Sequence, residues 1–386
     1  MDQPQSHTAR RLLEVAVVFF WASEYCHAPY FTPYLHSLQM GSTLVGIIIS
    51  CYGFTQMLVR IPLGIFTDTT GAYKKIITVG LFCTTVSSLG LFLTTNFVGI
   101  LLFRMLAGVA ASTWIATTVV YMAMFSEAES VRASARLNAL NNGGKLLAFV
   151  LGGAAATLLN YRITLFMSFA VGLVGLVVMP FVTVPAIRRT PLSLSRLGAV
   201  FTDKRILIPS LLMAVQQMIL HSTVFSFTSN LAESRGAAAW MLSLLSAVFT
   251  AVQIFSARII GGKRFQAIDR HAAILFGFAL QFVYLAVLAL APNAWVILAG
   301  QVVCAFGGAI LASLLLAECV SHVSQGERST VVGVYQAVYG LGMTMGPMLF
   351  GRWMDSGSPA RACFLLLGLC AVLVAALFCI GRDCKK

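Results

Sequence analysis

The chain carries little charge for its length. Only 10% of its 386 residues are Asp, Glu, Lys or Arg, and only 13 of them are acidic. Soluble domains average about 25% charged residues, so a soluble domain of this size is not expected. The sequence also contains no Gly-x-x-x-x-Gly-Lys-Ser/Thr loop for ATP hydrolysis and no His-Glu-x-x-His zinc site. We therefore expect neither an enzyme nor a bound cofactor.

Cysteine is present without a pattern. The nine cysteines show no metal-ligand spacing, and all but Cys384 fall within apolar stretches. Small apolar side chains packed between helices explain them better than disulfides or a metal site. We expect no metal centre.

Long hydrophobic runs fill the chain instead. Hydrophobic residues make up 59% of it, and a helix needs roughly 20 apolar residues to cross a bilayer. The sequence predicts twelve spans, at residues 12–37, 42–67, 75–94, 97–123, 137–158, 163–186, 206–230, 238–261, 271–291, 294–320, 329–354 and 361–381. Little chain remains for an extramembrane domain.

The positions of the cations predict the orientation. Most of the 26 Lys and Arg lie in alternate loops, and only Arg162, Arg235 and Arg361 lie in loops on the opposite side. Positive loops stay in the cytoplasm, so both termini are expected there, in a plasma membrane such as a bacterial inner membrane. The formal charge of +13 is spread between the apolar segments rather than over one soluble face. Nucleic acid is therefore not an expected partner.

The loop between the second and third predicted spans carries a specific pattern. It consists of Gly64, Asp68, Gly71 and the pair Lys74 and Lys75. This order resembles the signature loop of the major facilitator superfamily, a family of secondary transporters. Gly64 would let two helices approach closely, and Gly71 would permit a tight reversal.

The resemblance implies a mechanical role for this loop at a cytoplasmic gate. In the family, the loop forms charge contacts between helices that favour the outward-open state. With Arg60 upstream, Asp68 could pair with Arg136, or with Arg132, near the fifth span. The alternative is a polar turn that only fixes topology.

An internal repeat supports a two-fold design. A shift of 198 residues places Arg60 on Arg258 and Gly144 on Gly342. Parallel repeats of this kind carry the transport site between two halves. We expect an all-α integral membrane protein with the fold of the major facilitator superfamily, in which twelve helices form two pseudo-symmetric bundles. The predicted bundles are residues 1–186 and 206–386, joined by a cytoplasmic linker at 187–205.

Two further motifs bear on the kind of transporter. Arg104 and Gly108 in the fourth span match the family pattern Arg-x-x-x-Gly. Family antiporters often carry a Gly-Pro pair in the fifth span, where this chain has Ala148 and Phe149. This departure weakens a drug-antiporter assignment without excluding it.

Three residues are candidates for proton coupling: Glu24 and His27 in the first span and Arg104 in the fourth. Burial favours the protonated form of a carboxylate, so Glu24 could load and release a proton. Histidine titrates near neutral pH when it is exposed to water. The resemblance implies coupling or substrate binding for Arg104. The alternative for all three is structural hydrogen bonding or ion pairing between helices.

Substrate contacts are expected on the spans that line the central cavity in transporters of this resemblance. The candidates are Tyr30, Tyr34, Trp114, Lys145, Gln216, Gln217 and His221. Aromatic rings could stack on a flat compound. Lys145 could bind an anion, or it could pair with Glu24 at similar depth. Interhelical hydrogen bonding is the alternative for the amides and for His221.

Together these features predict a secondary active transporter that moves a small organic solute by alternating access. Proton coupling is expected, with symport and antiport both open. The alternatives are an uncoupled facilitator or a multidrug efflux antiporter, and more remotely a membrane receptor or enzyme. The expected partners are the solute, protons and the lipid bilayer, and the chain is expected to act as a monomer.

Overall fold

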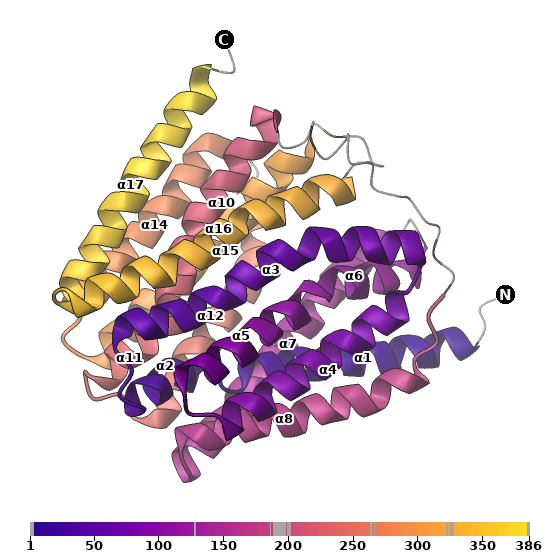
Figure 1. Ribbon diagram of the computed structural model, residues 1–386. Coiled ribbons are helices and arrows are strands. Elements are labelled where there is room, and N and C mark those ends of the chain that lie inside the picture. Colours follow the sequence, from indigo (N-terminus) through magenta and orange to yellow (C-terminus); the bar gives the residue numbers. More distant parts are fainter. Residues whose placement is uncertain are drawn as a thin grey trace. The chain divides into compact units, whose positions relative to one another are not determined.

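Helices account for all the regular structure that the computed structural model describes (Figure 1). The described residues are 4–126, 129–185, 187, 198, 202–262, 265, 267–321, 323 and 328–383. Most of the predicted linker at 187–205 lies outside them. Nine helical segments within these ranges are long and apolar enough to cross a membrane.

Each predicted span corresponds to one helix or to two or three consecutive helical segments. The first six spans contain α1 (Pro4–Tyr25), α2 (Ala28–Ser37), α3 (Ser42–Thr70), α4 (Tyr73–Leu93), α5 (Phe97–Ser112), α6 (Trp114–Ala123), α7 (Ser130–Leu158), α8 (Tyr161–Val178) and the short η2 (Met179–Phe181). The others contain α10 (Lys204–Ser222), the π-helical η3 (Thr223–Phe227), α11 (Thr228–Glu233), α12 (Ala239–Ile260), α14 (Arg270–Leu290), α15 (Ala294–Ser321), α16 (Arg328–Asp355) and α17 (Pro359–Asp383).

Side-chain caps mark where several helices begin. Asn96 accepts a hydrogen bond from Gly99 N at 2.8 Å at the start of α5, and Asn160 accepts one from Ile163 N at 3.0 Å at the start of α8. Asp269 caps α14 in the same way. These contacts satisfy backbone donors that have no partner inside the helix.

The predicted span at 12–37 is interrupted, which corrects the expectation of a single helix there. α1 ends at Tyr25 and α2 begins at Ala28. Pro29 lacks the N–H that would continue the backbone ladder of α1, so the helix restarts around it. His27 therefore lies at a break between helices.

The signature loop adopts the predicted tight reversal. Gly71 has a φ of 69°, a conformation that side-chain-bearing residues rarely adopt. The expectation for Gly64 is wrong, because no described atom lies within 4 Å of a methyl group built there. Gly64 therefore does not mediate a close helix contact in this structure.

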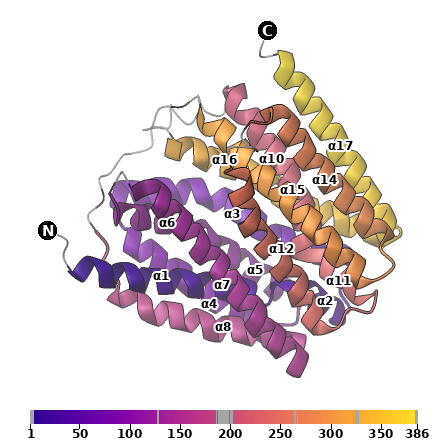
Figure 2. The same cartoon turned by 180° about the vertical axis from the view of Figure 1, so that it is seen from behind.

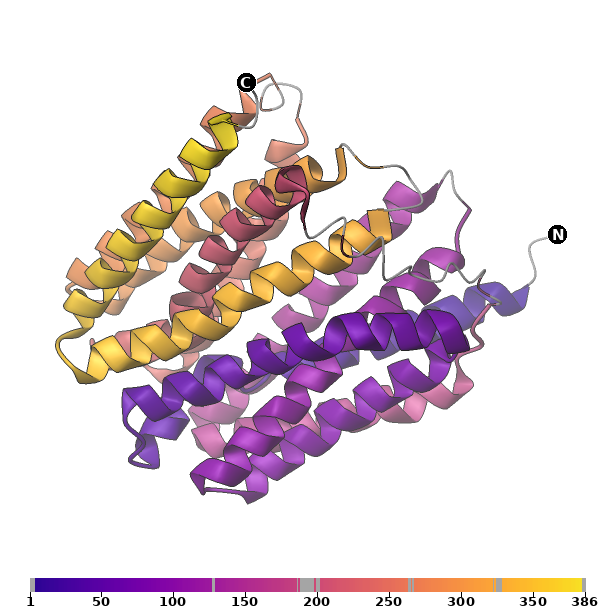
Figure 3. The ribbon, with the colours of Figure 1, turned by 45° about the horizontal axis from the view of Figure 1, so that its top comes forward.

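The chain divides into two compact units. The first contains Met1–Phe31 and Leu58–Leu192, and the second contains Thr32–Met57 and Ser193–Lys386. In the first unit α4 packs against α5 and α8, and α1 packs against α7 and α8 (Figure 2). In the second unit α10 runs along α16, and α14 packs against α15 and α17 (Figure 3). The predicted division at 186 and 206 stays a prediction.

The 198-residue repeat reappears in the packing inside each unit. A methyl group built at Gly144 of α7 would overlap the backbone of Val18 in α1. One built at Gly342 of α16 would overlap the backbone of Ala214 in α10. Both helix pairs thus approach through equivalent glycines, as small residues allow.

A π-helical turn interrupts the seventh span two residues after His221. The hydroxyls of Thr223 and Ser226 donate to the carbonyls of Ile219 and Ser222, at 2.6 and 2.7 Å. Hydroxyls that bond back to the preceding turn compete with the regular ladder. Wide turns of this kind occur frequently at functional sites.

Candidate functional site

A cluster of polar side chains is buried inside the first unit around Glu24. Glu24 belongs to α1 and only 4% of its surface is exposed. The Thr84 hydroxyl on α4 hydrogen-bonds its carboxylate, and the Arg104 guanidinium on α5 attracts it. Its Oε1 atom has no hydrogen-bond partner among the described atoms. A buried carboxylate oxygen without a partner is costly and is well suited to receive a proton.

His27 joins Glu24 and Arg104 in this cluster, and its contacts define its tautomer. Arg104 Nη1 lies 3.4 Å from His27 Nε2, and His27 Nδ1 lies 3.0 Å from Ser168 Oγ. A guanidinium can only donate, so Nε2 accepts the bond from Arg104. Nδ1 therefore carries the proton and donates to Ser168, and the ring is neutral.

Arg104 lies against an aromatic ring as well as the cluster. Its Cζ atom is 5.2 Å from the centroid of the Phe31 ring. A charged side chain within a membrane span is retained only where protein or water replaces its hydration. The His27 ring, the Phe31 face and the attraction of Glu24 supply that environment. All three residues predicted for proton coupling thus come together.

Lys145 lies in the first unit too, but its contacts are aromatic. Its Nζ atom is 4.8 Å from the Tyr25 ring centroid and 5.2 Å from that of Trp21. Trp114 packs edge-on against Trp21 with the centroids 5.1 Å apart. The hypothesised pair with Glu24 is wrong for this structure, because no ion pair within the described residues includes Lys145. Cation–π contact with two rings takes its place.

The predicted tyrosines lie in different environments. Tyr30 is fully buried and stacks on Tyr161 in the first unit, with the ring centroids 5.5 Å apart. Tyr34 is also buried and belongs to the second unit. Its carbonyl accepts a hydrogen bond from Ser37 at 2.6 Å. Neither ring is an open stacking surface in this structure.

The second unit holds the amide candidates. Gln216 Nε2 donates to the Gly308 carbonyl at 3.3 Å, and His221 Nδ1 lies 3.2 Å from the Gln217 carbonyl. The side-chain oxygens of Gln216 and Gln217 have no hydrogen-bond partner among the described atoms. A buried amide oxygen without a partner is costly, so a hydrogen-bond donor that reached either oxygen would be bound favourably.

Comparison with known proteins places this arrangement in a family. The profile described as Major Facilitator Superfamily matches residues 13–347 and 230–383, which is most of the chain. The chain belongs to the major facilitator superfamily. It is therefore a secondary transporter and not an enzyme, and the predicted family and fold are confirmed. Among curated proteins, none is similar enough in sequence to count as a relative.

Solved structures share the fold of this superfamily member at low sequence identity. A bacterial homologue of the human lysosomal transporter Spinster is 14% identical, with a TM-score of 0.79 over 99% of this chain and 98% of that one. The nucleoside transporter NupG is 13% identical, with a TM-score of 0.80 over 97% and 99%. The human organic anion transporter MFSD10 is 16% identical, with a TM-score of 0.71 over 97% and 100%.

The signature loop of the superfamily makes contacts other than those expected. Asp68 Oδ1 accepts a hydrogen bond from the Tyr73 hydroxyl at 2.8 Å, and Lys74 donates to the Pro180 carbonyl at 2.8 Å. Arg60 is buried, while Lys75 is exposed. Arg136 Nη2 instead bonds Glu14 Oε2 at 2.8 Å. Within the described residues no ion pair joins Asp68 to Arg136 or to Arg132, so the hypothesised latch is not formed in this structure.

Glu14 and Gln281 are polar residues that sequence reasoning missed. Glu14 is buried on α1 and also accepts from the Tyr121 hydroxyl at 2.8 Å. Gln281 is fully buried on α14 and donates to the Cys304 carbonyl at 2.9 Å. Each lies within a predicted membrane span, and a polar residue at such a position is the signal that marks a buried partner.

Proposed function

We propose that this transporter moves a small organic solute across the plasma membrane by alternating access, coupled to protons at Glu24. The observation that carries the proposal is the buried Glu24 carboxylate, with one oxygen unpartnered and with Arg104 and His27 beside it. We further propose that the chain acts as a monomer with both termini in the cytoplasm, as its loop cations favour.

Charge balance in the cluster suggests how a proton could act. An ionised Glu24 attracts Arg104, whereas a protonated Glu24 does not. Proton binding therefore frees the guanidinium to contact an anionic solute or to rearrange against His27. The Cys83 thiol on α4 is a further described titratable group within electrostatic reach of Glu24. Ionisable groups inside membrane spans commonly serve proton relays in this way.

Solute recognition is proposed for the aromatic and cationic side chains near this cluster. Lys145, Tyr25 and Trp114 would contact a flat or anionic organic compound. Similar solved structures include a nucleoside transporter, an organic anion transporter and a transporter in complex with a conjugated peptide. At such low identity these structures select none of the three solute classes, so all three belong in a first screen.

The test begins with that screen and ends with a pH gradient. Nucleosides, organic anions and peptides are tested for thermal stabilisation of the purified protein, because a ligand of the native state raises its Tm. The most stabilising compound is then followed in proteoliposomes. Glu24→Gln is expected to abolish gradient-driven accumulation while exchange of the compound across the membrane continues.

Glu129→Gln is the matched control, because Glu129 is an exposed carboxylate that accepts hydrogen bonds from Ser126. This variant should transport normally. If the rate and extent of wild-type transport do not change with the pH gradient, proton coupling is overturned and an uncoupled facilitator is favoured. If the Glu24→Gln variant still accumulates the compound in response to the pH gradient, Glu24 is not the coupling residue.

A further inference from the structure

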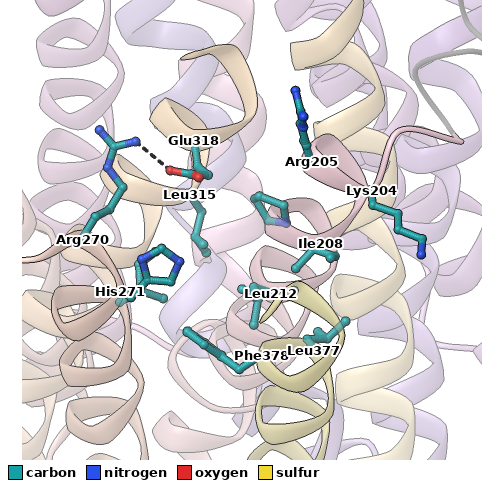
Figure 4. Close-up of a pocket in the computed structure, with 13 residues that line it drawn as sticks. Lys204, Arg205, Ile208, Leu212, Arg270, His271, Leu315, Glu318, Leu377 and Phe378 are labelled. Atoms are coloured by element: carbon teal, nitrogen blue, oxygen red, sulfur yellow. Dashed lines mark hydrogen bonds and ion pairs between the residues drawn. The ribbon is translucent and has the colours of Figure 1, made fainter. Parts of the chain in front are cut away.

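A cavity of about 470 Å³ lies in the second unit, where α10 and α14 begin and α17 ends (Figure 4). This volume is within the range of about 300–1,000 Å³ that small-molecule sites occupy. Its walls come from α10, α14, α15 and α17. No residue of the Glu24 cluster lines the cavity, so it is separate from the proposed coupling site.

The mouth of this cavity carries excess positive charge. Arg270 Nη1 bonds Glu318 Oε2 at 2.7 Å, so these two charges offset each other. Lys204 and Arg205 open α10 and are both exposed. Within the described residues, no ion pair includes either of them. Two cations therefore remain available to an anion at the mouth.

The interior of the cavity is apolar. Leu212, Ile274 and Leu315 are buried side chains that line it, and Phe378 of α17 lines it from the side of the last helix. In Figure 4 the heads of Arg205, Arg270 and Glu318 lie at one end, and Leu212, Leu377 and Phe378 lie at the other. Leu212 follows Lys204 by eight residues, a distance of about 12 Å along a helix.

Where α17 passes α10 beside this cavity, there is room for a further methyl group. A methyl group built at Gly381 would have its nearest neighbour, Ile208, at 3.9 Å. The glycines between α16 and α10 leave no such room, since a methyl group at Gly342 would overlap the Ala214 backbone. The open space is therefore confined to the region where the ends of α10, α14 and α17 meet.

We propose that this cavity binds an anionic phospholipid of the bilayer, with the phosphate at Lys204 and Arg205 and one acyl chain along Leu212, Ile274 and Phe378. Cations alone would suit any anion, but the apolar interior favours an occupant with a hydrocarbon chain. The ends of membrane-spanning helices lie at the depth of lipid headgroups. Basic pockets between such helices attract anionic headgroups. The proposal is independent of proton coupling.

The charge requirement is tested with lipids on the purified full-length protein in neutral detergent. Native mass spectrometry follows titrations with phosphatidylglycerol and with phosphatidylcholine. Phosphatidylglycerol should bind about tenfold more tightly, since each nearby cation favours anionic lipid severalfold. Lys204→Gln with Arg205→Gln should remove about that advantage. The matched control is the double variant Arg11→Gln with Arg132→Gln, which removes two exposed cations of the first unit. This control variant should bind both lipids as the wild type does.

The chain requirement is tested with a variant that fills the interior and with a headgroup that has no chain. Leu377→Trp should weaken both lipids and leave the Tm of the lipid-free protein close to wild type. Glycerol phosphate should not displace phosphatidylglycerol at equal concentration. The proposal is overturned if the two lipids bind the wild type equally, if the double glutamine variant retains the preference, or if glycerol phosphate competes as well as the lipid.

Discussion

Lys145 Nζ lies 4.8 Å from the centroid of the Tyr25 ring, and both residues belong to the first unit. Trp21 presents a second ring at 5.2 Å. An ammonium inside a membrane protein is thus stabilised by aromatic faces and not by a carboxylate. Lys145 can therefore meet an anionic group of a solute without first breaking an ion pair.

Double-mutant cycles on the free energy of unfolding should separate these two kinds of partner. The cycle between Lys145→Gln and Tyr25→Leu should give a coupling of about 0.5–2 kcal/mol, the range of cation–π contacts. The cycle between Lys145→Gln and Glu24→Gln should give less than about 0.5 kcal/mol, as for residues without a shared contact. Reversible unfolding in mixed micelles measures both. A larger coupling energy with Glu24 would indicate that Lys145 and Glu24 form an ion pair.

The Glu14 carboxylate should be a stability determinant of the first unit. Arg136→Gln removes one of its donors and is expected to cost about 1–2 kcal/mol, because the arginine is half-exposed and water replaces part of the contact. Tyr121→Phe should cost about 1 kcal/mol. Unfolding measurements should show Arg132→Gln, at an exposed site on the same helix, within about 0.5 kcal/mol of the wild type. Equal losses of unfolding free energy for Arg136→Gln and Arg132→Gln would contradict the stabilising role of the contact between Arg136 and Glu14.

Asp355 ends α16 and caps α3 within the second unit, just outside the predicted span at 329–354. Its oxygens accept from Ser42 N at 2.9 Å and from Thr43 N at 2.7 Å. Burial raises the pKa of Asp355, but the hydrogen bonds from Thr43 and Ser42 outweigh burial and leave this pKa below its ordinary value. The ionised form is therefore the one that stabilises the fold.

The sign of the pH dependence at Asp355 follows from that shift. A lowered folded-state pKa contributes stability above the ordinary range of Asp, about 3.9, and this stability is lost as the pH falls through the folded value. Asp355→Asn should lower stability at neutral pH by about 0.5–1 kcal/mol, the range of charge effects at helix N-termini. Thermal melts should show the difference between wild type and variant shrinking in acid. A constant difference would contradict the role of charge.

Gly342 and Gly333 on α16 form a matched pair for testing close helix packing. Gly342→Ala would place a methyl group into the Ala214 backbone and should cost about 1–3 kcal/mol, as overpacking does. Gly333→Ala meets no described atom within 4 Å and should be neutral or slightly stabilising. Chemical unfolding of both variants compares them directly. Similar losses at the two sites would mean that helix propensity, and not contact with α10, controls the result.

Much of the candidate site was predictable by residue type but not by partner. Glu24, His27 and Arg104 are rare polar residues in apolar spans, and the structure brings all three together. Asp68 and Arg136 were equally visible, yet they bond Tyr73 and Glu14. A charged residue within a span must find a partner, but several partners satisfy that need. The depth of a residue along its helix does not specify which neighbouring helix its side chain faces.

The sequence by itself determined the number of spans, the repeat and the family, because these depend on runs of consecutive residues. About 20 apolar residues cross a bilayer whatever they pack against, and a local motif such as Gly64 to Lys75 needs no distant partner. Only the tertiary structure decided the contacts. Glu14 and Arg136 are 122 residues apart in the chain, and the lipid cavity combines four helices. Such sites depend on the rotation and spacing of packed helices, which no single segment encodes.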